Sequence, residues 1–99
     1  MAHHRATRAE IDLQAFRHNF QNLRNHISPQ TRIMAVVKAD AYGHGALPCA
    51  RMAVDSGADY LGVGVIEEGI EFRKSGLDTP ILILASIFPD EAEDLVRHD

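Results

Sequence analysis

The apolar residues of the chain recur with two different spacings, and each spacing predicts a different element. From Leu13 to Ile27 they recur every three or four positions, which predicts a helix with one apolar face. Asp12 suits the N-cap of that helix, and Pro29 ends it because proline lacks a backbone donor. Continuous apolar runs are typical of strands buried on both faces in a parallel sheet. Such runs occur at residues 32–37, 60–65 and 81–84.

Helical patterns separate these apolar runs. We expect helices at about 45–56 and 66–74, each ended by a glycine, and a last helix with Pro89 in its first turn. Strands ~20–30 residues apart have the spacing of repeated βα units. Right-handed crossovers make successive strands parallel neighbours, so the sequence predicts an α/β chain. Three strands leave two unpaired edges and one uncovered face, so by themselves they should be unstable or self-associate.

The composition argues against several classes of partner. The formal net charge is −4, which gives no electrostatic reason to bind nucleic acid or an anionic membrane. No apolar run approaches the ~18 residues of a membrane span, and the first residues lack the apolar core of a signal peptide. Cys49 is the only cysteine, which leaves no internal disulfide and fits a reducing compartment. We therefore expect a soluble, cytoplasmic protein with no nucleic-acid or membrane partner.

Lys38 ends the first apolar run, at the position where barrel and open α/β enzymes place their chemistry. A lysine there must reach water, pair with an anion or lose its charge, because an isolated buried ammonium is very costly. An uncharged lysine amine is nucleophilic enough to form a Schiff base with a carbonyl compound. Its position alone leaves two interpretations open: a reactive lysine, or a solvated residue of an ordinary loop.

The histidines do not form a convincing metal site. The adjacent pair His3-His4 does not share a helix face, and His18 and His26 are two helical turns apart. We read the last two as solvated side chains and expect no metal site.

Three further polar or reactive residues have simple structural interpretations. Cys49 falls inside the predicted helix 45–56, where a small buried residue is expected. Glu67 and Glu68 fall in the first turn of the next helix, where the helix dipole favours carboxylates. We expect both glutamates to be surface residues.

The residues from Val37 to Gly45 read VKADAYGHG and resemble the pyridoxal-phosphate attachment motif of alanine racemase, a fold-type III enzyme. Weaker similarity extends to both sides, at residues 9–13, 18–19, 67–70 and 80–84. The matches correspond to the N-terminal portion only of a complete family member. The resemblance implies that residues 12–99 are the first βα units of a (β/α)8 TIM-type barrel, incomplete in this chain, since a barrel typically needs ~250 residues. It also implies that residues 1–11, with a short strand at 7–11, pack with a C-terminal β domain.

The same resemblance implies a reaction and a cofactor. Lys38 would hold pyridoxal 5′-phosphate covalently as an internal aldimine, and the freed amine would move a proton to or from the α-carbon of alanine. Tyr42 matches the family position whose hydroxyl contacts the cofactor phosphate; otherwise it is an aromatic residue packing against the sheet. Asp40 is expected to shape the loop through hydrogen bonds to the backbone.

The implied reaction interconverts L-alanine and D-alanine, which supplies a cell-wall precursor. The family acts as a homodimer, and the second acid/base is a tyrosine from the partner subunit's C-terminal domain. This tyrosine and the family's arginines near the cofactor and substrate lie outside this chain. Residues 1–99 alone are therefore expected to be inactive.

Two alternatives fit the same barrel. The substrate pocket lies outside this chain, which leaves open a racemase for serine, lysine or several amino acids. A non-catalytic pyridoxal-phosphate-binding protein is also open, although such proteins carry the lysine without the tail of residues 42–45. Fold-type III decarboxylases have a different motif after their lysine, which argues against that class.

Overall fold

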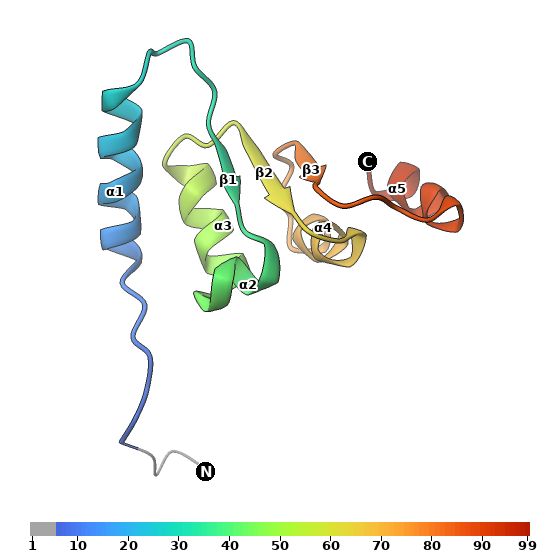
Figure 1. Cartoon of the computed structure of the whole chain (residues 1–99), viewed down its shortest axis with the longest axis horizontal. Coiled ribbons are helices and arrows are strands. Elements are labelled where there is room, and N and C mark those ends of the chain that lie inside the picture. The colour runs from blue at the N-terminus through green and yellow to red at the C-terminus, as the bar shows by residue number, and fades with distance from the viewer. Residues whose placement is uncertain (1–5) are drawn as a thin grey trace.

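The computed structural model describes residues 6–99, and its centre is a three-stranded parallel sheet. The strands stand in the order in which they occur in the sequence (Figure 1): β1 Met34–Val36, β2 Tyr60–Val63 and β3 Ile81–Ile83. Met34 lies opposite Tyr60, and Leu61 lies opposite Ile81. The predicted α/β class and the parallel order of the strands are confirmed.

Helices join the strands, and further helices precede the first strand and follow the last one. They are α1 Leu13–His26, α2 Lys38–Gly43, α3 Ala46–Asp55, α4 Ile66–Lys74, the short 3-10 helix η1 Pro89–Glu91, and α5 Ala92–His98. Asp12 begins α1 as predicted, because its carboxylate accepts hydrogen bonds from the backbone N–H groups of Gln14 and Ala15 at 2.9 and 3.1 Å. Gly57 follows α3 with φ at +109°, a conformation that favours glycine at the end of a helix.

One face of the sheet carries the core. Helices α3 and α4 lie against this face, and α1 packs on α3 (Figure 1). Gly69 lets α4 approach closely, since a Cβ there would lie 3.7 Å from Ile81 Cγ2 and 3.8 Å from Val63 Cγ2. The buried cluster consists of Val37, Ala41, Cys49, Ala50, Leu61, Val63 and Phe72.

The opposite face of the sheet is open. Side chains from β1 and from the residue just after β3 converge over Gly62, where a Cβ would lie 3.1 Å from Met34 Sδ and 3.4 Å from Leu84 Cδ1. Val36 is 38% exposed and Leu82 is 48% exposed. No element among residues 6–99 covers this face, as expected for three strands that cannot close a barrel.

Residues 7–11 do not form the strand that the sequence predicted. They are irregular and exposed, and no strand of the described chain lies beside them. A strand needs a neighbour to pair its backbone N–H and C=O groups, and the sheet of residues 6–99 begins at β1. No helix in the described part of the chain combines the length and apolar character of a membrane span.

Candidate active site

Lys38 stands directly beyond β1, at the C-terminal edge of the sheet. Val37 before it is 2% exposed and donates its N–H to Gly62 O at 2.9 Å, so the backbone leading to Lys38 is fixed to β2. Lys38 itself is exposed. Gly64, just past the end of β2, leaves room for its side chain, because a Cβ at Gly64 would lie 3.5 Å from Lys38 Cβ. The structure therefore places Lys38 where the sequence predicted, with its stem against the end of the neighbouring strand.

The segment after Lys38, which belongs to α2, is a left-handed turn and not a regular helix, whereas the sequence predicted a loop. Four consecutive residues, Ala39, Asp40, Ala41 and Tyr42, have φ between 51° and 57°. Left-handed backbone costs roughly 1–2 kcal/mol for each residue with a side chain. Such a segment persists only where its surroundings over-determine it, and strained segments of this kind concentrate at functional sites. Contacts with the surrounding residues must therefore hold residues 39–42 in this conformation.

Several hydrogen bonds close the turn from within. Ala41 N–H donates to Val37 O at 3.0 Å, and Gly45 N–H donates to Asp40 O at 2.9 Å. The Asp40 carboxylate accepts from Ala46 N–H at 2.8 Å, which pairs a free donor at the start of α3. The prediction that Asp40 shapes this segment through backbone hydrogen bonds is confirmed.

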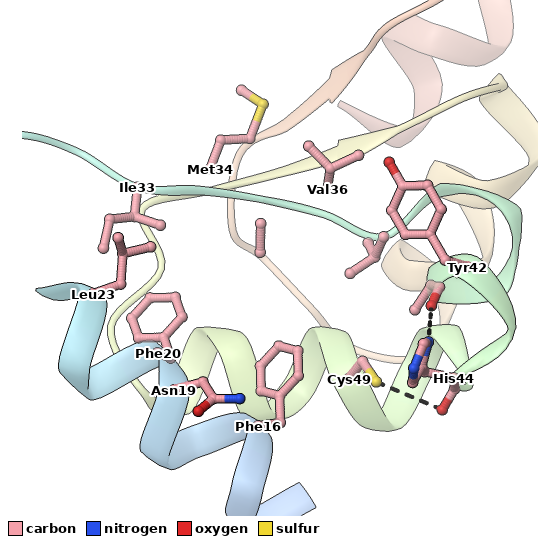
Figure 2. A pocket seen from close by; sticks show the side chains of 13 residues that line it. Phe16, Asn19, Phe20, Leu23, Ile33, Met34, Val36, Tyr42, His44 and Cys49 are labelled. Carbon is pink, nitrogen blue, oxygen red and sulfur yellow. Dashed lines mark hydrogen bonds between the residues drawn. The ribbon is translucent and has the colours of Figure 1, made fainter. Parts of the chain in front are cut away.

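His44 completes the turn, a role that its sequence position did not reveal. Its ring Nδ1 lies 2.9 Å from Ala41 O, and a carbonyl only accepts, so Nδ1 carries the proton of the ring (Figure 2). Its own carbonyl accepts a weak hydrogen bond from Cys49 Sγ at 3.6 Å. Burial, and secondarily the nearby charge of Asp40, raises the pKa of the Cys49 thiol. Cys49 is thus a buried thiol that packs in the core, as predicted.

Glu68 anchors the turn from outside. Its Oε2 accepts the N–H of Ala39 at 2.8 Å, and its Oε1 accepts the N–H groups of Gly64 at 2.7 Å and Val65 at 3.2 Å. Glu68 lies in the first turn of α4 as expected and is half-buried, but its carboxylate also lies between two strand ends, which the sequence did not predict. Its neighbour Glu67 is exposed, as expected.

Tyr42 projects from the turn beside β1. It is 59% exposed and, together with Val36, lines a groove of about 390 Å³ between α1 and β1. Figure 2 shows its ring standing next to Val36, whereas the ring of His44 lies on the other side of the turn. Its hydroxyl has no hydrogen-bond partner among residues 6–99.

The other candidate residues stay apart from this turn. His18 Nε2 lies 3.2 Å from Asn22 Nδ2 on the exposed side of α1, and His26 is also exposed. Within residues 6–99 no group of three or more His, Cys, Asp and Glu side chains is placed to hold a metal ion. The pair His3-His4 lies outside the described residues.

Comparison with known proteins identifies the chain. A family model described as "Alanine racemase, N-terminal domain" matches residues 11–99. The chain belongs to the alanine racemase family. It is 52% identical over 82 residues to alanine racemase of Nostoc sp., covering 83% of this chain and 21% of the relative. It is 51% identical over 94 residues to alanine racemase of Symbiobacterium thermophilum, covering 95% and 25%.

Solved alanine racemases share the fold. The structure of alanine racemase from E. faecalis superposes with a TM-score of 0.93 at 38% identity, over 100% of this chain and 27% of that one. The enzyme of Streptomyces coelicolor superposes with a TM-score of 0.73 at 46% identity, over 87% and 24%. The chain thus spans about a quarter of the length of its relatives. Its three βα units are the first units of the (β/α)8 barrel, as predicted.

The side chains at the first strand end fit the cofactor that the alanine racemase resemblance implies. Lys38 presents an exposed primary amine, which is the group that forms a Schiff base with an aldehyde. Tyr42 presents an exposed hydroxyl from the same turn, and a phenol can donate to a phosphate oxygen. Lys38 and Tyr42 are therefore the residues of this chain that could hold pyridoxal phosphate.

Proposed function

We propose that the complete protein interconverts L-alanine and D-alanine with pyridoxal 5′-phosphate as cofactor, and that Lys38 holds the cofactor. The observation that carries the proposal is the position of Lys38, exposed at the C-terminal end of β1 in a chain of the alanine racemase family. Parallel α/β proteins bind their ligands at that edge of the sheet. The left-handed turn that follows supports the same conclusion, because backbone strain concentrates at functional sites.

Lys38 has two tasks in this proposal. Its primary amine would hold the cofactor covalently, and the same amine would accept or return a proton at the α-carbon of alanine. Bound pyridoxal phosphate supplies a conjugated ring that delocalises the electron pair left when that proton departs. Racemisation also needs an acid/base on the opposite side of the α-carbon. We assign that group to a second subunit, so the working protein is a homodimer.

Tyr42 positions the cofactor in the same proposal. Its hydroxyl would donate a hydrogen bond to the cofactor phosphate. Residues 1–11 pack with a C-terminal β domain, and residues 12–99 contribute the first part of the barrel. We place the protein in the cytoplasm, where it supplies D-alanine as a cell-wall precursor.

The test of the proposal is a borohydride-reduction experiment on the complete gene product. Borohydride fixes a Schiff base as a stable adduct, which intact mass detects and peptide mapping locates. Lys38 and Lys74 are the only lysines of this sequence, so Lys74 is an internal control. We expect the adduct on Lys38 and not on Lys74, together with conversion of L-alanine to D-alanine.

The other outcomes each contradict a different part of the proposal. No adduct on Lys38 would reject the cofactor assignment. An adduct without racemisation of any amino acid would favour a non-catalytic pyridoxal-phosphate-binding protein. Racemisation of serine or lysine in preference to alanine would keep the mechanism and reject the substrate. Residues 1–99 expressed alone should not racemise alanine.

A further inference from the structure

One carboxylate connects the first two strand ends. Glu68 lies in the first turn of α4, and its oxygens accept three backbone N–H groups from two separate segments. Gly64 and Val65 belong to the segment between β2 and α4. Ala39 follows Lys38 and precedes Glu68 by 29 residues in the sequence. Each oxygen serves one segment, since Oε1 accepts from Gly64 and Val65 and Oε2 accepts from Ala39.

Capping α4 explains only half of this arrangement. A glutamate at the third helical position commonly accepts the N–H of its own N-cap residue, which here is Val65. That bond uses Oε1. The bond from Oε2 to Ala39 adds nothing to α4 but fixes the first residue of the left-handed turn, directly after Lys38.

The Glu68 carboxylate and the Lys38 side chain both lie close to Gly64. A Cβ at Gly64 would lie 3.2 Å from Glu68 Oε1 and 3.5 Å from Lys38 Cβ. The absence of a side chain at Gly64 therefore leaves space for both the Glu68 carboxylate and the Lys38 side chain. Hydrogen bonds that involve a charged partner are short and roughly twice as strong as neutral ones, and the 2.7 and 2.8 Å distances here fit that class.

We propose that Glu68 is a positioning residue for Lys38: by holding the N–H of Ala39 it fixes the direction in which the Lys38 side chain leaves the backbone. Glu68 touches neither substrate nor cofactor in this proposal. The positioning role rests on the proposed cofactor role of Lys38 only for its consequence for the reaction, because the hydrogen bond between Glu68 and Ala39 does not require the cofactor. The consequence is that the amine is held where it attacks the aldehyde and moves the substrate proton.

The substitution Glu68→Gln separates the capping of α4 from the hydrogen bond to Ala39. A glutamine has one carbonyl oxygen and one NH2 group, so it accepts on one side only. The carbonyl oxygen of the amide should face Gly64 and Val65, where it accepts two N–H groups, so its NH2 group meets the N–H of Ala39 and the left-handed turn loses its acceptor. Glu67→Gln is the matched control, because Glu67 is the adjacent residue of α4, is exposed, and would lose the same charge at the same helix end.

The experiment compares the complete gene product with Glu68→Gln and Glu67→Gln in three readouts. Hydrogen exchange of the peptide containing Ala39, measured without cofactor, should become roughly ten- to hundredfold faster in Glu68→Gln, as expected for losing a hydrogen bond to a charged group. The rate of borohydride trapping of pyridoxal phosphate at Lys38 should fall, as should kcat, by about tenfold or more. KM for alanine should change less, and Glu67→Gln should match the unmodified protein in all three.

A purely structural role for Glu68 predicts a different result. It would lower the temperature of unfolding while leaving exchange at Ala39 and trapping at Lys38 unchanged, and that outcome would overturn the proposal. If Glu68→Gln fails to fold, Gly64→Ala tests the same contact from the other side, since its Cβ would lie 3.2 Å from Glu68 Oε1 and the carboxylate would have to shift by a few tenths of an ångström. Unchanged trapping and exchange in Gly64→Ala would equally overturn it.

These readouts separate this inference from the proposed function. If the unmodified protein forms no adduct on Lys38, the cofactor role fails, yet exchange at Ala39 still decides whether Glu68 holds the turn. If the unmodified protein forms the adduct and Glu68→Gln forms it equally fast, the cofactor role stands and the positioning role is rejected.

Discussion

The segments that follow β1 and β3 lie at the same edge of the sheet but are built differently. After β1, four consecutive residues without glycine adopt left-handed backbone, and the segment is anchored by Glu68 from 29 residues away. After β3, residues 84–88 contain no positive φ. There the N–H of Phe88 donates to Glu91 Oε1 at 2.7 Å, only three residues along the chain.

Glu68 and Glu91 show what the difference means. Both stand at the third position of the helix that follows a strand, and both accept the backbone N–H of the residue before that helix. Only Glu68 uses its second oxygen to hold another βα unit. An unstrained segment thus needs a local cap alone, whereas the strained segment that carries Lys38 requires a partner from the next unit. The predictions below test this contrast between the two segments.

The largest expected effect comes from enlarging the side chain inside the strained turn. Ala41 is buried with φ at 53°, and valine there would overfill the core and force a β-branched residue into left-handed backbone. We expect Ala41→Val to lose about 2–4 kcal/mol of unfolding free energy. Ala85→Val, at an exposed position after β3, should stay within about 0.5 kcal/mol. Equilibrium denaturation of both variants measures the difference, and equal losses would contradict the contrast.

The next effect concerns the aromatic residue that each segment exposes. Tyr42 carries a hydroxyl, whereas Phe88 after β3 is 72% exposed and carries none. Hydrogen bonds to charged groups contribute about 1.5–3 kcal/mol, so Tyr42→Phe should weaken pyridoxal-phosphate binding by roughly tenfold or more. Titration of cofactor-free protein followed by absorbance measures this affinity.

Tyr60→Phe is the control for that measurement. Tyr42 and Tyr60 are the only tyrosines of the sequence, and Tyr60 stands at the opposite end of the sheet, where its hydroxyl accepts from Arg32 at 2.7 Å. Its loss should leave cofactor affinity unchanged. Equal affinities in Tyr42→Phe and Tyr60→Phe would assign Tyr42 to packing against the sheet.

The sequence correctly predicted the helices whose ends are fixed by residues close to them in the sequence. Asp12 caps α1 through N–H groups two and three residues away, and α4 has the predicted bounds of 66–74 because its ends are likewise set by neighbours. The predicted strand at 7–11 was wrong because a strand depends on a partner, which the described chain does not supply. The position of Lys38 at a strand end was predicted because a continuous apolar run ends on it, whereas its cofactor role was predicted only from the resemblance of residues 37–45.

The turn after Lys38 was not predicted because nothing in its residues requires it. Alanine and tyrosine disfavour left-handed backbone and aspartate adopts it only as a single residue, so residues 39–42 read as an ordinary loop. The bond from Ala39 to Glu68 depends on the pairing of β1 with β2, which brings residues 29 apart to one edge. A signal for Glu68 was present, since it falls at the third position of a helix that begins without a polar N-cap side chain.

The smallest expected effect differs in sign between the two segments. Ala39 and Ala85 are both exposed, but only Ala39 has a positive φ. Ala39→Gly would relieve roughly 1–2 kcal/mol of strain and lose about 0.4–1 kcal/mol through the freer unfolded chain, so it should be neutral or more stable by up to about 1.6 kcal/mol. Ala85→Gly should only lose about 0.4–1 kcal/mol. Denaturation of both variants decides the sign, and equal losses would mean that the turn is unstrained. If Ala39→Gly gains stability while borohydride trapping at Lys38 slows, the strain holds the lysine in place at the expense of stability.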